Sequence, residues 1–171
     1  MGDVSVAGPP NEREYYLYQP RVERDEYHDI ARSITRRVLD VSPRRVSEIR
    51  VMGTIPVLEA AGVSQEALNT LCKAGFAVTD EQLDGRVGSS EEAIDAVLSS
   101  YAPGLHHAHF FDSDGYGIAA RYDDTLQHYW LPASAYLELR AEVEPEVRTA
   151  LLTIDELEDV TERKRREGSE T

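Results

Sequence analysis

The hydrophobic residues of this chain change their spacing at Pro103-Gly104. Before this dipeptide, apolar side chains recur every three or four residues, which places them along one side of a helix. After it, apolar and polar side chains alternate, as in a strand with one buried face. Proline and glycine together interrupt regular structure, so the dipeptide marks a boundary. The sequence predicts an α+β fold with a helical N-terminal half, a three-stranded antiparallel meander at about 105–131 and C-terminal helices.

Helices are predicted from this spacing together with end signals. A segment at about 25–39 repeats apolar side chains at helical intervals. Ser42-Pro43 suits the start of a short helix that points Val46 and Ile49 inward, because serine can cap a helix and proline fits its first turn. The other predicted helices lie at 56–62, 64–74 and 90–101 and begin at Pro132 and Pro145, with capping boxes at Thr79 to Gln82, Ser89 to Glu92 and Thr153 to Glu156.

The meander is predicted to contain three strands, at His106 to Asp112, Tyr116 to Tyr122 and Thr125 to Leu131. Asp114-Gly115 and Asp123-Asp124 are its tight-turn candidates. Two-residue turns at these positions set the register of both hairpins. The resulting pairs are His109 with Ala120, Phe110 with Ala119, and Ala119 with His128.

The histidines of this region are the candidates for a metal site. In the predicted register, His107 and His109 share one face of the sheet, whereas His106 and His128 share the other. A catalytic zinc needs three converging protein ligands, and neither face supplies them. The sequence therefore predicts no metal and no cofactor. A metal-dependent enzyme using these histidines is kept as a third hypothesis.

Two further features favour structural roles over chemistry. Asp112-Ser113-Asp114-Gly115 begins like a calcium-binding loop, but a hairpin turn is the preferred interpretation because the following residues have strand character. Cys72 shares a helical face with Leu68 and Leu71, so we expect it to be a small buried hydrophobic residue. The chain also has no P-loop, dinucleotide-binding glycine turn or nucleophile elbow. No catalytic residue is predicted.

The ends of the chain are polar, and a tyrosine-rich segment follows the first of them. Residues 1–13 are predicted to be a flexible arm, 14–160 a single α+β domain and 161–171 a charged tail. Glu14-Tyr15-Tyr16-Leu17-Tyr18-Gln19 has strand character. Its three tyrosines, Tyr15, Tyr16 and Tyr18, are candidates for binding a protein partner, along an edge strand or across a neighbouring chain.

The charge of the chain is strongly negative. There are 32 acidic and 18 basic residues, which gives a net charge of −14, and Lys73 and Lys164 are the only lysines. An acidic surface with few lysines suits a protein from a high-salt organism, because carboxylates hold water and cations and concentrated salt screens their repulsion. A GC-rich genome that favours arginine codons is the alternative explanation. The balance argues against a general polyanion-binding protein.

Residues 57–71 partly resemble the helix-turn-helix of DNA-binding proteins. Gly62 lies at the expected turn, between Val57 and Ala61 on one side and Leu68 on the other. The resemblance implies a recognition helix within 64–73. It departs from the pattern at Leu58, where a small residue is usual. The groove-facing residues that it implies are Ser64, Gln65, Asn69 and Thr70.

A local cluster of arginines in 31–50 adds to this second hypothesis. Six arginines stand there against Asp40 and Glu48, a reversal of the chain's overall charge that could hold phosphates. The alternative is that these arginines pair with carboxylates elsewhere in the protein. The arginines proposed to contact nucleic acid are Arg44, Arg45 and Arg50.

The sequence therefore leads to three functional hypotheses. The first is a non-enzymatic structural, assembly or adaptor protein that binds other protein subunits, such as a subunit of a virion or another oligomeric particle. The second is a helix-turn-helix regulator that binds nucleic acid, and the third is the enzyme. No apolar run approaches the roughly 20 residues of a membrane span, and the N-terminus is unlike a secretory signal. We expect a cytoplasmic or particle-associated protein without a membrane partner.

Overall fold

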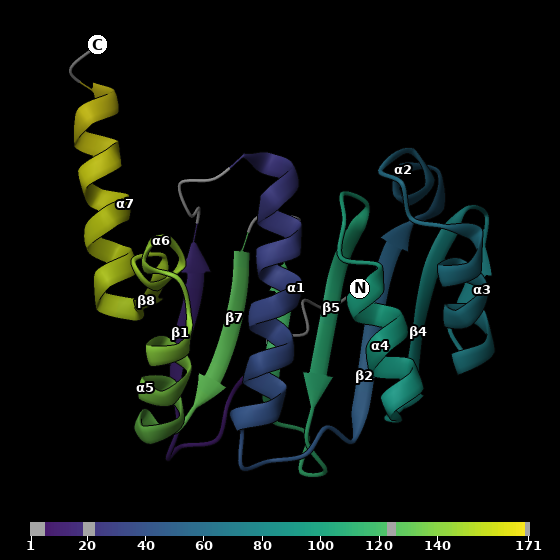
Figure 1. Ribbon diagram of the computed structural model, residues 1–171, viewed down its shortest axis with the longest axis horizontal. Helices are drawn as coiled ribbons and strands as arrows, with labels where there is room; N and C mark the ends of the chain where they lie inside the picture. The colour runs from purple at the N-terminus through teal and green to yellow at the C-terminus, as the bar shows by residue number, and fades with distance from the viewer. Residues whose placement is uncertain (1–5, 19–22, 123–125, 170–171) are drawn as a thin grey trace.

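The protein is an α+β fold built on one antiparallel sheet of eight strands, in the order β3-β4-β2-β5-β6-β7-β1-β8 (Figure 1). The computed structural model describes residues 6–18, 23–122 and 126–169. The strands are β1 (Arg13–Tyr18), β2 (Glu48–Thr54), β3 (Ala77–Thr79), β4 (Gln82–Gly88), β5 (Leu105–Phe111), β6 (Gly117–Tyr122), β7 (Leu126–Leu131) and β8 (Leu151–Thr153).

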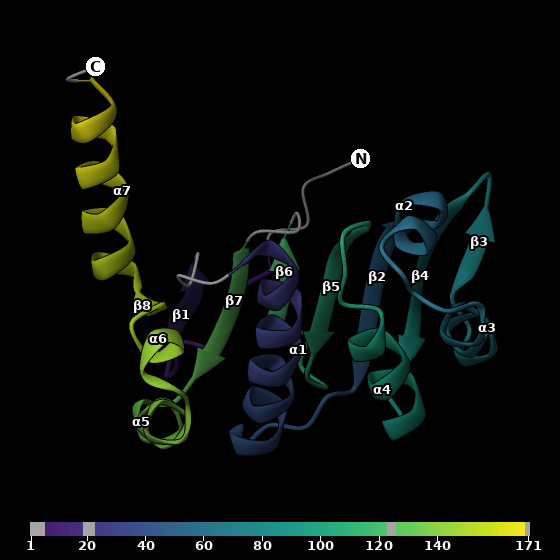
Figure 2. The same cartoon turned by 45° about the horizontal axis from the view of Figure 1, so that its top comes forward.

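The helices connect the strands and cover one side of the sheet. Helices α1, α4 and α5 lie in front of the strands in Figure 1, and Figure 2 shows the same layer from a second angle. The helices are α1 (Arg24–Val41), α2 (Ile55–Ala60), α3 (Gln65–Ala74), α4 (Glu91–Ser99), α5 (Ala133–Glu142), α6 (Pro145–Arg148) and α7 (Ile154–Ser169).

The hydrophobic core lies between this helical layer and the sheet. Strand residues that point toward the helices are almost completely buried, as are Ile49, Val51 and Phe110, and so are the residues of α1 that meet them. Several polar side chains inside this core bond one another, as Gln127 does with the Tyr27 hydroxyl at 3.2 Å, while the Gln127 Oε1 atom has no partner among the described residues. Thr35 of α1 bonds the hydroxyl of Tyr129 at 3.0 Å. This layer completes one face of the sheet.

The expected distribution of elements along the chain is wrong. The N-terminal half was expected to be helical, with the sheet confined to a three-stranded meander, but β2, β3 and β4 lie in that half and extend the meander on one side. Strands β1 and β8 extend it on the other side. The tyrosine-rich strand expected at 14–19 is β1.

Strand β2 explains how the error arose. Ser42-Pro43 was interpreted as a helix start that placed Val46 and Ile49 inward, but residues 48–54 alternate strictly between partly buried and buried positions. Strand β2 pairs with β4 on one side and β5 on the other, and the alternation along it places residues 49, 51 and 53 on the helical side of the sheet. The alternating pattern of residues 48–54 is a weak strand signal because it includes Gly53. The helix signal of Ser42-Pro43 is stronger, so it decided the prediction.

The hairpin of β3 and β4 was also missed. Thr79 to Gln82 was expected to be a capping box, whereas these two residues face each other across a two-residue turn. Asp80 and Glu81 take positive φ angles of 49° and 65° there. Glycine or asparagine is usual at such positions, so Asp80-Glu81 is a weak signal for this turn.

Two of the other predicted capping features are present or nearly so. Thr153 and Glu156 form the expected reciprocal box, in which the Thr153 amide donates to Glu156 at 2.8 Å and the Glu156 amide donates to Thr153 at 3.4 Å. The cap of α4 is Ser90, one residue after the predicted Ser89.

Helix α7 projects away from the rest of the molecule (Figures 1 and 2). None of its residues is buried. Its second half contains residues that were expected to form a charged tail. On the side toward β1, Lys164 lies over the ring of Tyr18, 4.9 Å from the ring centre. Within the described ranges, no helix has the length and apolar character needed to cross a bilayer.

Candidate functional site

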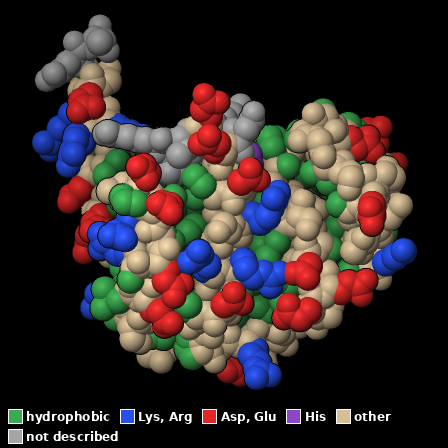
Figure 3. Space-filling view, viewed as in Figure 1, with side chains coloured by type: hydrophobic (Ala, Val, Ile, Leu, Met, Phe, Trp, Pro, Cys, Tyr) green, Lys and Arg blue, Asp and Glu red, His purple; other side chains and the backbone are tan. Residues whose placement is uncertain are grey.

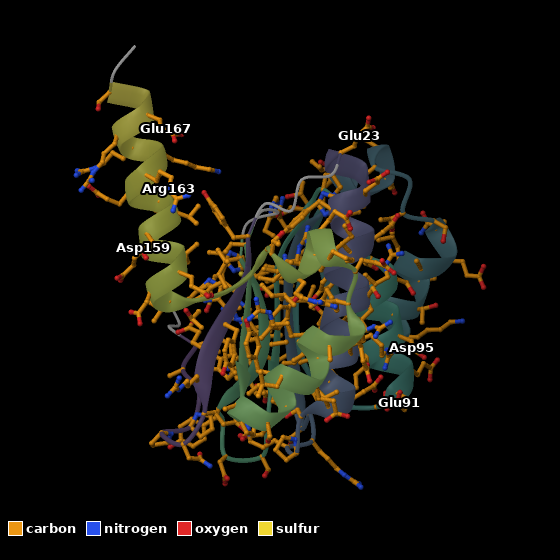
Figure 4. The ribbon with its side chains drawn as sticks, turned by 60° about the vertical axis from the view of Figure 1, so that its left-hand side comes forward. Glu23, Glu91, Asp95, Asp159, Arg163 and Glu167 are labelled. Atoms are coloured by element: carbon orange, nitrogen blue, oxygen red, sulfur yellow. The ribbon has the colours of Figure 1, made fainter. Side chains whose placement is uncertain are left out.

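The candidate site is the face of the sheet opposite α1, α4 and α5, which we call the open face. In Figure 4 these helices lie to one side of the strands, and on the other side only α7 rises, at one end of the sheet. Antiparallel sheets of this kind commonly present polar residues to water on their uncovered face. Here the open face carries rings instead. Four buried apolar residues lie outside the hydrophobic core and belong to it, namely Tyr16, Phe111, Ala120 and Trp130.

Aromatic and imidazole rings form a continuous chain of contacts across four strands of the open face. Tyr122 of β6 lies at its centre, with ring centres 4.9 Å from His109 and 4.6 Å from His128. On the β5 side the chain continues to His107 and Phe111. On the β7 side, His128 contacts Tyr16 of β1 and Trp130, at 4.6 Å and 6.1 Å between ring centres.

One carboxylate supports the β1 end of this ring cluster. Glu14 accepts a hydrogen bond from Nδ1 of His128 at 2.6 Å when that nitrogen carries a proton. Burial raises the pKa of Tyr16 above its usual value, and the negative charges of Glu14 and of Glu158 on α7 add to the rise. Lys164 of α7 lies over the ring of Tyr18, which is on the same side of β1 as Tyr16, so α7 lies beside this end of the open face.

His109 is the least solvated member of the cluster. Its side chain is 4% exposed, and neither ring nitrogen has a hydrogen-bond partner within the described part of the chain. Burial lowers the pKa of His109 to about 4, because a charged ring loses its hydration there, and the positive charge of His107 and Arg50 lowers it further. A buried, neutral and unsatisfied imidazole is costly in a folded protein. It is therefore a residue whose role requires an explanation.

The predicted register is right for the first hairpin and wrong for the second. His109 pairs with Ala120 and Phe110 with Ala119, as expected. His128, however, pairs with Ala120 and not with Ala119, because three residues separate the paired Tyr122 and Leu126. A shift of one residue turns a side chain to the other face. His128 thus shares the open face with His107 and His109. The predicted turn at Asp123-Asp124 lies outside the described residues.

These three histidines do not form a metal site. The ring of Tyr122 stands between His109 and His128, and the Nδ1 atom of His128 is taken by Glu14. Among the described residues, no three His, Cys, Asp or Glu side chains are arranged to hold a metal ion. His106 bonds the hydroxyl of Thr54 at 2.9 Å.

A segment from the N-terminus lies across one end of the open face. We call residues 6–8 the strap. The amide of Gly117 donates to the carbonyl oxygen of Ala7 at 2.9 Å, and Gly8 lies directly against the Trp130 ring. A Cβ atom on Gly8 would be 2.0 Å from a ring carbon of Trp130, so only glycine fits. The strap leaves Trp130 3% exposed.

Arg44 anchors the residues that follow the strap. Its guanidinium group contacts Glu12 at 2.5 Å and Asp112 at 2.8 Å, and it donates to the carbonyl oxygen of Gly117 at 2.8 Å. The Glu12 side chain is 2% exposed. Hydrogen bonds from Arg44 and from the amides of Tyr116 and Asp114 lower the pKa of Asp112, against the effect of its burial. Arg44 is thus a structural residue, and the predicted hairpin at Asp112-Ser113-Asp114-Gly115 joins β5 to β6.

The other arginines of the predicted basic cluster are mostly paired within the chain. Arg36 contacts both Glu91 and Asp95, which lie together on α4 in Figure 4. Arg37 contacts Glu142 at 3.2 Å. Lys and Arg side chains are interspersed with Asp and Glu over the helical side (Figure 3). These arginines therefore fit the alternative interpretation, in which the cluster pairs with carboxylates elsewhere in the protein.

The structure does not bring the proposed nucleic-acid contacts together. Arg50 alternates with the inward-facing Ile49 and Val51, so it lies on the open face, whereas α3 lies on the helical side. Arg45 is exposed in the connection from α1 to β2. Gly62 does form the expected left-handed turn, with φ of 91°. The remaining candidates serve α3 itself: Ser64 caps it, Gln65 bonds Asn69, and Thr70 bonds the carbonyl oxygen of Glu66.

The three candidate tyrosines are used by the chain's own fold. Tyr15 points into the core and stacks on Tyr136 of α5, with ring centres 3.7 Å apart. Tyr16 belongs to the ring cluster, and Tyr18 lies beneath Lys164. Strand β1 pairs with β7 on one side and β8 on the other, so it is not an edge strand.

The sequence predictions missed three important residues of the site and placed His128 on the wrong face of the sheet. Tyr122, Trp130 and Glu14 were not proposed as members of one surface, because their meeting depends on β1 joining the meander beside β7. Strict alternation of ring-bearing residues at 107, 109 and 111 was the available signal. Cys72 was expected to be buried but is exposed on α3.

The chain has no recognisable relative in the comparisons with known proteins. No protein-family model matches it, and neither a curated protein nor a solved structure shows significant similarity to it.

Proposed function

We propose that this protein is a non-enzymatic assembly protein whose copies associate through the open face. The observation that carries the proposal is His109, a buried imidazole that has no hydrogen-bond partner among the described residues and lies in a ring cluster that none of the described helices covers. The His109 ring is shut off from water, so solvent does not supply the hydrogen bonds that its nitrogens lack. A second protein layer would complete it, as α1, α4 and α5 complete the other side.

The composition of the open face supports this role. Aromatic side chains are enriched in protein interfaces and often dominate their binding energy. Tyr122, His107 and His128 are partly exposed and present rings and polar atoms together. Partly exposed rings that also carry polar atoms are typical of protein interfaces.

Charge supports association between copies of this chain. Each copy has a net charge of −14, so two copies repel one another over most of their surfaces. Among the described strand residues, the open face carries two arginines, Arg50 and Arg86, and three carboxylates, Glu14, Glu48 and Asp84. Arg86 contacts Glu48, and Glu14 contacts His128. The open face is thus close to neutral, and repulsion between copies is smallest there.

A pair of matched variants tests the proposal. Tyr122→Glu places a carboxylate at the centre of the open face, and Leu137→Glu places one on the exposed side of α5, where Leu137 is 63% exposed. Molar mass is measured by light scattering across a concentration series at low and molar salt, since salt screens the repulsion between copies. We expect oligomers for the wild type and for Leu137→Glu, and a folded monomer for Tyr122→Glu. A wild-type chain that stays monomeric throughout, or equal behaviour of the two variants, would overturn the proposal.

A further inference from the structure

We propose that Trp130 is an anchor of the assembly interface and that the strap covers it in the isolated chain. The inference rests on the proposed function, since it assigns Trp130 and residues 6–8 their parts in the same surface. The partner that displaces the strap is a second copy of this chain.

The position of Trp130 makes it suitable as an anchor. Trp130 lies two residues after His128 on β7, so both side chains point to the open face. The Trp130 ring therefore continues the cluster formed by Tyr122 and His128. Tryptophan is among the residues that contribute most to binding when buried at an interface. In the isolated chain Gly8 already lies against its ring, and Val6 lies close by over Gly117. The largest ring of the open face is therefore withheld from a partner.

The strap is held much less firmly than the residues that follow it in the sequence. One backbone hydrogen bond, from Gly117 to Ala7, ties the strap to the sheet within the described residues. Behind it, the Glu12 amide donates to the Pro9 carbonyl oxygen, and Arg44 holds the Glu12 side chain. The strap can therefore leave Trp130 while the Glu12 anchor and β1 stay in place. Segments with few hydrogen bonds and few buried contacts open at low free-energy cost.

Two glycines show that the fit between strap and sheet is specific. Gly8 has no room for a Cβ atom against Trp130, and a Cβ on Gly117 would be 2.4 Å from Val6 and 2.9 Å from Trp130. The backbone of Gly8 is not in the left-handed region, so alanine there acts through contact with the ring alone. Gly8→Ala is thus a selective way to push the strap away from Trp130.

The experiment uses Gly8→Ala in the full chain, with Ala7→Ser as the matched control because Ala7 is exposed. Trp130 is the only tryptophan, so its fluorescence reports on this site alone. We expect Gly8→Ala to shift the emission to longer wavelength and to increase acrylamide quenching at least twofold at low concentration. We also expect its association constant to rise about tenfold, and the Ala7→Ser values to equal those of the wild type.

Each result of this experiment has a distinct interpretation. A change in fluorescence with an unchanged or lower association constant would overturn the inference, because the strap would then be part of the interface or unrelated to it. Unchanged fluorescence would also overturn it, since the strap would not cover Trp130 as described. If Tyr122→Glu fails to disrupt assembly, the proposed function fails instead, whatever the fluorescence of Gly8→Ala shows.

Discussion

The two faces of the sheet differ in what completes them. On the helical side, Phe110 and Tyr129 are covered by the chain's own helices, and the Tyr129 hydroxyl is bonded to Thr35. On the open face, His109 and Trp130 are as well buried by area, but among the described residues it is neighbouring rings and the strap that cover them. The same strands thus present a core covered by helices on one side and, within the described residues, a layer of rings without such a cover on the other.

The difference shows that burial alone does not define a core. A core residue gains from dense packing on all sides, whereas a ring lying on a sheet with no layer above it has neighbours only beside it and beneath it. Side chains on the open face therefore contribute less to folding than their buried area implies. They remain available to contribute to association.

The largest expected effect compares two adjacent phenylalanines of β5. Phe110 is completely buried under the helices, and Phe111 is 6% exposed on the open face. Phe110→Ala should lower the free energy of unfolding by about 3–5 kcal/mol, because it leaves a cavity in a packed core. Phe111→Ala should cost less than half as much. Urea denaturation of the two variants measures both, and equal losses would show that the open face is packed like a core.

The second effect is a pH dependence that arises from His109. The folded chain protonates His109 only near pH 4, while the unfolded chain does so near its ordinary pKa of 6.5. Between these values the unfolded state holds more protons, so the free energy of unfolding falls as pH falls. From pH 7 to pH 5, the fall due to His109 should be about 2 kcal/mol.

His109→Phe provides the reference for this prediction, because the phenyl ring does not titrate. Denaturant titrations of both proteins at the two pH values give the difference that belongs to His109, since the other groups titrate alike in both. If the wild type and His109→Phe lose equal stability on acidification, His109 is not buried and neutral in the folded chain.

The smallest effect concerns the bonded pair on the helical side. Tyr129→Phe leaves the Thr35 hydroxyl buried without its partner, which should cost about 1–2 kcal/mol. Adding Thr35→Val to that variant removes the unsatisfied group, so the double variant should be more stable than Tyr129→Phe alone. Thermal unfolding of the three proteins checks the order, and an additive loss in the double variant would exclude the bond as a stabilising contact.

Local signals in the sequence predicted the parts of the fold that depend on neighbouring residues. The helix expected at 25–39 is α1, the Thr153–Glu156 box is present, and the β5–β6 register is confirmed. Each depends on spacing, on a cap or on a tight turn. In contrast, β2 and β4 are strands because they pair with each other and with β5. Pairing between distant segments left only a weak alternation in the sequence.

The candidate site depended even more on distant contacts. One additional residue between β6 and β7 moved His128 to the face of His107 and His109. The placement of β1 beside β7 then brought Glu14 to His128. Neither event is encoded in a motif, so the sequence alone suggested separated histidines and a free tyrosine segment. The open face became visible only with the order of the strands.

The central claim, that copies meet at the open face, is tested most directly by cysteine trapping. In a Cys72→Ser background, which removes the only native cysteine, Tyr122→Cys is compared with Leu137→Cys under a short bifunctional maleimide cross-linker. The account predicts rapid cross-linking into dimers for Tyr122→Cys and only slow, collision-limited cross-linking for Leu137→Cys. Equal rates for the two positions, or faster cross-linking at 137, would contradict it.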